Sequence, residues 1–156
     1  MKTILLSFKP QYFEPIRLGT KKYEYRGRFA DEELKAYIYL SSPEKKVAAI
    51  MYLGRRLQLE DMKHKFKEEP ETVNRIEQYI SLYNKRYAIP INRVALIHPI
   101  PLDTIREALP GFMPPQSYMF VRDSSILMRV LDAADIASDE IVIDHNCISP
   151  EDICVN

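Results

Sequence analysis

The sequence predicts an α+β fold: a small, mostly antiparallel β-barrel with a helical insertion and a C-terminal helix. Short apolar runs rich in β-branched and aromatic residues are separated by turn residues, which is typical of antiparallel strands. Residues 57–84 instead repeat apolar side chains at intervals of three and four, as a helix does. A further stretch with helical spacing follows at 123–136, near the C-terminus.

The size and composition fit one domain over residues 1–156. A hydrophobic fraction of 46% and a charged fraction of 28% are ordinary for a soluble globular protein. No apolar run approaches the roughly 20 residues that cross a bilayer. The run between Lys2 and Lys9 is too short for a secretory signal. We therefore expect a cytoplasmic protein that does not associate with a membrane.

Strands dominate the first part of the chain. Residues 3–8 are β-prone and apolar, which indicates a buried strand. Pro10 then opens a short helix, and Gly19 ends it, because glycine accepts a positive φ. Further strands are expected at 36–40 and 46–54. The second of these is apolar on both faces, so we place it centrally in the barrel.

Helices interrupt the strands of the second part. We expect the insertion at 57–84 to cover one mouth of the barrel. The remaining expected elements are a strand at 87–100, a helix at 102–109, a strand at 118–121, a helix at 123–136 capped by Asp123 or Ser124, and an edge strand at 141–143. The last dozen residues are polar, and we expect them to be loosely held.

Residues 19–26, Gly-Thr-Lys-Lys-Tyr-Glu-Tyr-Arg, are unusual for a strand of a barrel. With a side-chain period of two, Lys22, Glu24 and Arg26 share one face, and the two tyrosines between them share the other. A row that concentrates charges of both signs needs a polar environment. Taken alone, a solvated face with a weak surface ion pair explains this pattern.

The spacing G-x-K-x-x-E-x-R in this stretch resembles the signature of the ASCH (activating signal cointegrator homology) family. The residues that carry the resemblance lie at 7–10 and 19–26 near the N-terminus, and at 99–102, 111–112 and 114–118 farther along. The matches span roughly residues 3–121, so we expect the core there and a C-terminal helical extension over 122–156. The resemblance implies a PUA-like barrel.

The resemblance also implies a cleft that binds RNA, a nucleotide or a nucleoside. The candidate ligand-binding residues are Lys9, Lys21, Glu24, Arg26, Gln116, Ser117 and Tyr118. The cations are suited to phosphate or carbonyl oxygens, and Glu24 to an exocyclic amine or to holding Arg26. We expect Glu24 and Arg26 to point together into a partly enclosed site. Tyr23, Tyr25 or Tyr118 is suited to stacking on a base, although alternating strand tyrosines are also typical of a barrel core.

Two further functions stay open. Some ASCH proteins similar to this chain hydrolyse an acylated cytidine amide, using the motif lysine, a threonine on the same strand and a distant glutamate. Lys21 matches that lysine, but Glu24 stands where the threonine would be, so we rank this amidohydrolase reading below binding. Ribonuclease activity, attributed to other members, needs a general base, and His98 is better explained as structural. The other alternative is a non-catalytic protein-interaction domain.

No cofactor or metal site is predicted. Cys147 and Cys154 are the only cysteines, and they lie outside any two-residue metal spacing. A zinc site with His145 and Asp144 needs a turn that returns Cys154 to the others, and no such turn is indicated.

Charge is distributed unevenly along the chain. Residues 1–67 carry 15 Lys and Arg against 8 Asp and Glu, and the remainder carries 7 against 14. The basic first half suits an anionic ligand if the fold keeps the halves apart. If the halves interleave in space, their charges cancel.

Overall fold

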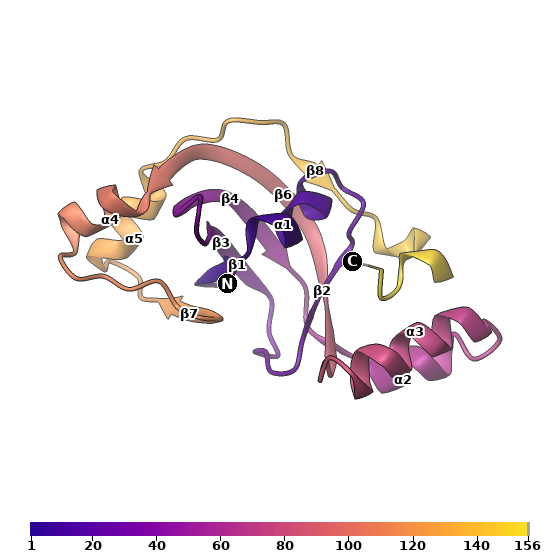
Figure 1. Ribbon diagram of the computed structural model, residues 1–156. Coiled ribbons are helices and arrows are strands. Elements are labelled where there is room, and N and C mark those ends of the chain that lie inside the picture. The colour runs from indigo at the N-terminus through magenta and orange to yellow at the C-terminus, as the bar shows by residue number, and fades with distance from the viewer. Residues whose placement is uncertain (156) are drawn as a thin grey trace.

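The computed structural model describes residues 1–155, which form a mixed sheet with five α-helices around it (Figure 1). The strands are β1 (Lys2–Phe8), β2 (Tyr23–Arg26), β3 (Leu34–Leu40), β4 (Lys46–Leu53), β5 (Leu57–Gln58), β6 (Tyr87–Pro101), β7 (Tyr118–Val121) and β8 (Ile141–Val142). The helices are α1 (Pro10–Arg17), α2 (Leu59–Lys65), α3 (Pro70–Ser81), α4 (Leu102–Ala108) and α5 (Ile126–Asp132).

The sheet curls into a half-barrel. Its strands run in the order β2-β6-β4-β3-β1-β7, with β5 and β8 also paired to β6. Only the pairing of β1 with β3 is parallel among those described. The α+β fold class is thus confirmed, and so is the central place of β4. The barrel is open between its edge strands β2 and β7, so it is a half-barrel rather than the full barrel that the sequence predicted.

Apolar side chains fill both faces of the curled sheet. The concave face holds a buried cluster that includes Phe13 and Ile16 of α1. A second cluster packs α4 and α5 onto the opposite face, through Ile105, Leu127 and Leu131. These clusters fix β1, β3 and β4 between two apolar layers, which explains why these strands read as nearly continuous apolar runs.

The helical insertion and the chain end pack against the tyrosine face of β2. Tyr23 and Tyr25 lie in a third buried cluster with side chains of α2 and α3. Ile153 and Cys154 belong to the same cluster, with exposed fractions of 0% and 3%. The expectation of a loosely held tail is therefore wrong. A few apolar residues suffice to anchor this polar segment, because they meet an apolar surface that lies far away in the sequence.

Hydrogen bonds also hold the C-terminal strap, as we call residues 144–155. The Cys154 N–H donates to the Tyr25 hydroxyl at 2.7 Å, and Arg75 of α3 donates to the carbonyl of Ile153 at 3.1 Å. Lys22 pairs with Asp152 at 3.1 Å. The strap is thereby attached to both β2 and α3.

Two boundaries differ from expectation. The last helix, α5, spans Ile126–Asp132 only, and its N-cap is Ser125, whose Oγ accepts from the Met128 N–H at 3.0 Å. Ser124 has a left-handed φ of 62°, which places it in the preceding turn. No helix within residues 1–155 is long and apolar enough to cross a membrane.

Candidate functional site

The two faces of β2 have different surroundings. Tyr23 and Tyr25 are buried, with exposed fractions of 5% and 4%, so they occupy core positions rather than an open stacking surface. Burial raises the pKa of the Tyr25 hydroxyl well above its ordinary value. The opposite face carries Glu24 and Arg26, as the period of two predicts. Lys22, which we expected on the same face, instead pairs with Asp152 of the C-terminal strap and does not line the cavity.

Glu24 lies between two cations. Its Oε1 is 3.2 Å from Lys21 Nζ and also accepts from the Tyr25 backbone N–H at 3.0 Å. Its Oε2 is 3.1 Å from Arg26 Nη2. Lys21 and Glu24 are only 7% and 6% exposed, so this arrangement is largely shielded from water.

The end of α1 delivers Lys21 to this position. Gly19 has a φ of 77°, a left-handed conformation that glycine adopts without steric cost. The N–H groups of Thr20 and Lys21 then both donate to the carbonyl of Pro15, at 3.0 and 3.1 Å. This turn reverses the chain, so that Lys21 meets Glu24 three residues later.

Arg26 bridges the open side of the half-barrel. Its Nη2 donates to the carbonyl of Ser7 on β1 at 3.3 Å, and its Nη1 to Ser117 Oγ beside β7 at 3.1 Å. The guanidinium carbon is 5.4 Å from the centroid of the Phe8 ring. Side-chain bonds thus link the two sheet edges that no backbone pairing joins.

Ser7 places the second motif segment. Its N–H donates to the carbonyl of Ser117 at 2.9 Å, and its Oγ donates to the carbonyl of Pro115 at 2.6 Å. The loop before β7 is therefore attached to the end of β1, and the two motif stretches, which lie far apart in the sequence, become neighbours.

Most of the candidate residues surround one cavity of about 1330 Å³. The structure brings together Lys9, Lys21, Glu24, Arg26 and Gln116 in its lining. Ser117 does not line the cavity, and its hydroxyl reaches the site only by accepting a hydrogen bond from Arg26. Tyr118 lies outside the lining and packs against Phe29, with ring centroids 4.8 Å apart.

The lining is strongly cationic. Its charged side chains are Lys9, Lys21, Arg26, Lys45, Arg75, Lys85 and, as the one carboxylate among the described residues, Glu24. Six cations against one anion produce a positive potential in a partly enclosed space, which favours an anionic ligand. Burial lowers the pKa of Lys85; Glu24 opposes this shift, whereas Arg26 and Lys21 add to it.

Several lining residues were missed by the sequence reasoning. The sequence suggested that Lys85 is part of a helix end and that Tyr83 belongs to an apolar stripe with Val73, Ile76 and Ile80; Tyr79 was not singled out. Tyr79 lies in α3, whereas Tyr83 follows the end of the helix; their ring centroids are 5.7 Å apart, and Tyr83 is 60% exposed at the cavity. Nothing in the sequence alone indicates this exposure.

The two cysteines lie in different environments. Cys147 is exposed and 3.3 Å from Asp144 Oδ2, whereas Cys154 is buried against Tyr25. Burial raises the pKa of the Cys154 thiol to about 12, which leaves it without nucleophilic character at neutral pH. Residues 1–155 contain no group of three His, Cys, Asp or Glu side chains arranged to hold a metal ion.

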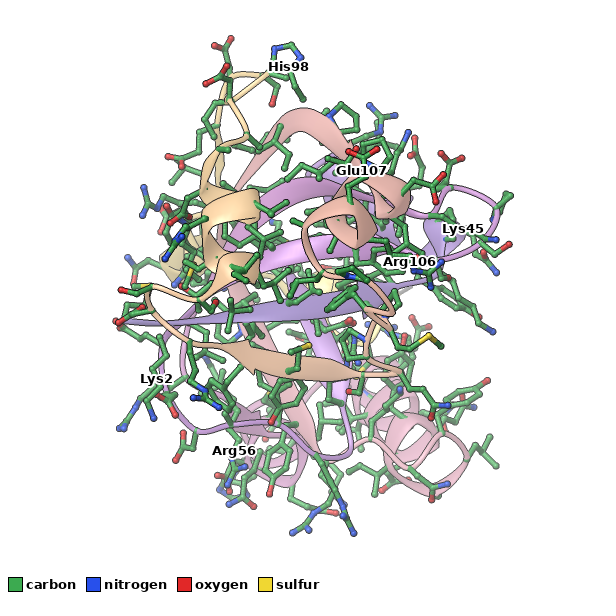
Figure 2. The ribbon with its side chains drawn as sticks, turned by 90° about the vertical axis from the view of Figure 1, so that its left-hand side faces the viewer. Lys2, Lys45, Arg56, His98, Arg106 and Glu107 are labelled. Atoms are coloured by element: carbon green, nitrogen blue, oxygen red, sulfur yellow. The ribbon has the colours of Figure 1, made fainter. Side chains whose placement is uncertain are left out.

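His98 is remote from the cavity. It lines a second, shallower hollow of about 710 Å³ beside α4 and α5. Figure 2 shows it at the opposite end of the molecule from Arg56. Its backbone N–H donates to the carbonyl of Asp135 at 2.9 Å, in keeping with a structural role.

Solved structures with this fold include the crystal structure of ASCH from Zymomonas mobilis. The TM-score is 0.65 at 22% sequence identity, and the superposition covers 86% of this chain and 96% of that one. A serine-to-alanine and a tyrosine-to-phenylalanine variant of the same protein give TM-scores of 0.64 and 0.65. No protein-family model and no curated protein matches the sequence. The chain therefore has the ASCH fold, as its motifs predicted.

Proposed function

We propose that this protein binds RNA or a modified nucleotide in the cavity around Glu24 and Arg26. The observation that carries the proposal is the lining itself, with six cationic side chains against one carboxylate. Lysine and arginine bind phosphate oxygens through charge-assisted hydrogen bonds. A phosphate group in the cavity would offset the mutual repulsion of these cations.

Aromatic side chains supply the second part of a nucleotide site. Tyr12 and Tyr83 line the cavity and are 55% and 60% exposed, so their rings are accessible to a base. Stacking on an aromatic ring tolerates any base, because every base has a π face. These two tyrosines therefore take over the stacking role for which Tyr23, Tyr25 and Tyr118 were considered.

Five of the six cations divide into two groups, and the sixth, Arg75, is hydrogen-bonded to carbonyls of the C-terminal strap. Lys21 and Arg26 are paired with Glu24, so they form a polar floor with a fixed geometry. Within residues 1–155, Lys9, Lys45 and Lys85 have no carboxylate within 4.0 Å. These three lysines are free to contact phosphates, whereas the buried set around Glu24 positions the ligand.

The alternatives have less support. A domain that only scaffolds protein partners does not need a convergent polar cavity. An amidohydrolase of the kind described above needs a threonine on the motif strand and a glutamate from elsewhere in the chain. The carboxylate in the described lining is Glu24, which stands at the threonine position. Both oxygens of Glu24 are already bonded to cations, so it is not available as a base.

Titration of a short fluorescent single-stranded RNA at several salt concentrations tests the proposal. The three free lysines of the cavity, each with a slope of about −0.7, contribute roughly −2 to the slope of log affinity against log salt. Lys85→Ala should make the slope shallower by about 0.7. Lys67→Ala, which changes an exposed lysine outside the cavity lining, is the matched control and should leave the affinity and the salt slope unchanged. Absent binding, or an affinity that does not depend on salt, would contradict phosphate recognition.

The affinity should also fall as the pH rises through the pKa of Lys85. Burial lowers that pKa below the ordinary value of 10.5, so the amine loses its charge earlier than an exposed lysine would. A neutral amine no longer attracts phosphate, and binding is therefore strongest below this pKa. Lys85→Arg keeps its charge throughout, so the alkaline loss of affinity should begin at a higher pH in this variant than in the wild type. The check is the same titration repeated from neutral to alkaline pH; superimposable profiles for the two proteins would exclude a role for Lys85.

A further inference from the structure

We propose that a bound RNA strand continues out of the cavity over an arginine patch at the end of the sheet. This arginine patch consists of Arg28, Arg56 and Arg86. The inference rests on the proposed function and extends it, because it identifies the ligand as a polynucleotide rather than a single nucleotide.

Tyr87 is the centre of the patch. The guanidinium carbons of Arg56 and Arg86 lie 4.1 and 5.5 Å from the centroid of its ring. Arg56 also donates to the carbonyl of Phe29, which fixes one end of its guanidinium and leaves other N–H groups free. Two cations are thus held over the same ring.

Close backbone packing brings the third arginine near. The Arg86 N–H donates to the carbonyl of Arg26 at 3.1 Å. Gly27 lies so close to the chain that an added Cβ would be 2.6 Å from the carbonyl oxygen of Asn84. The segment that carries Arg28 therefore runs directly beside the segment that carries Arg86. Figure 2 shows Arg56 at this end of the molecule, with His98 at the other.

The patch lacks compensating charge. Within residues 1–155, none of the three arginines has a carboxylate within 4.0 Å. Arg17 and Arg93, in contrast, are each paired with a glutamate. Asp31 and Glu33 follow on the neighbouring loop but stay beyond that distance. Gathering like charges costs free energy, which an anion bound across the patch would recover.

The patch is continuous with the cavity. Arg26 is the register partner of Tyr87 across β2 and β6, so the two side chains lie on the same face of the sheet. Arg26 and Lys85 line the cavity, and Arg86 follows directly. A strand leaving the cavity at Arg26 meets Tyr87 and its two guanidiniums next. The successive phosphates of an RNA strand can contact the cavity and the arginine patch together, whereas a single nucleotide occupies only one of them.

The test compares two probes on the full chain. One is uridine 5′-monophosphate, measured by calorimetry. The other is a labelled single-stranded RNA of about ten nucleotides, within the range of roughly 4–16 that a single binding fold covers. The variant is the double substitution Arg28→Gln and Arg86→Gln, which changes two exposed side chains. The control is Arg129→Gln, which removes the charge of an exposed arginine on α5, away from the patch.

The wild type should bind the RNA more tightly than the mononucleotide. The double variant should bind the RNA roughly tenfold more weakly, with a salt slope shallower by about 1.4, the value for two lost contacts. The affinity of the double variant for the mononucleotide should equal that of the wild type. Arg129→Gln should bind both probes with wild-type affinity.

Four results would overturn the inference. If the mononucleotide binds but the RNA binds no more tightly, or if the double variant binds RNA like the wild type, the patch is not part of the site and the cavity proposal survives. If neither probe binds, both proposals fail. If polyglutamate competes as well as RNA and loses its affinity in the double variant, the patch serves an acidic protein segment instead.

Discussion

Replacing Glu24 by glutamine is expected to lower the free energy of unfolding by about 3–5 kcal/mol. The carboxylate bonds Lys21 at 3.2 Å and Arg26 at 3.1 Å. Lys21 is only 7% exposed, so its ammonium would stay buried beside a neutral amide. Removing one member of a buried ion pair is costly for this reason, even where the intact pair contributes little net stability.

Chemical denaturation of matched variants measures this effect. Glu14→Gln removes the same charge from an exposed pair with Arg17 and should change the stability little. Adding Lys21→Met to Glu24→Gln removes the stranded ammonium and should restore much of the lost stability. If Glu24→Gln lowers the free energy of unfolding as little as Glu14→Gln does, water effectively solvates the charges around Glu24. The claim that Lys21, Glu24 and Arg26 are shielded from water would then be wrong.

The features of the site that sequence reasoning captured are local ones. The period of two in β2 separates Glu24 and Arg26 from the two tyrosines, and it needs no tertiary information. The turn at Gly19 follows from residue chemistry alone. The proximity of the two motif stretches came from the resemblance, because nothing in the sequence indicates that Ser7 bonds the loop before β7.

What the sequence did not reveal depends on contacts between distant segments. Lys85 lines the cavity because the chain passes close to β2 after the end of α3. The C-terminal strap also reaches the cavity, through Cys154. Ser117 and Tyr118 are adjacent, but Arg26 holds only the serine, while the tyrosine packs onto Phe29. Alternation along a strand predicts that the side chains of Ser117 and Tyr118 point to opposite faces, but it does not predict which of the two faces the site.

Arg26→Lys is expected to lower both the stability and the RNA affinity, although it keeps the charge. The guanidinium binds Glu24, Ser7 and Ser117 at once, at 3.1, 3.3 and 3.1 Å. A lysine presents one ammonium point charge in place of this planar fork, so it keeps the pair with Glu24 at best and releases the two sheet edges. We expect a loss of about 2 kcal/mol in stability, about 1 kcal/mol for each lost hydrogen bond.

The affinity should fall further than the charge alone predicts. Once the edges separate, the loop that carries Gln116 is no longer tied to the motif strand through Arg26, and the cavity loses its fixed shape. Preorganised sites bind more tightly because the ligand does not have to order them. Arg93→Lys, at an exposed pair with Glu140 outside the cavity, is the matched control and should leave both measurements close to the wild type. Thermal melts and the RNA titration, made on both variants, check the claim. If Arg26→Lys binds and melts like Arg93→Lys, then positive charge alone accounts for the role of Arg26, and its bridge across the open barrel is incidental.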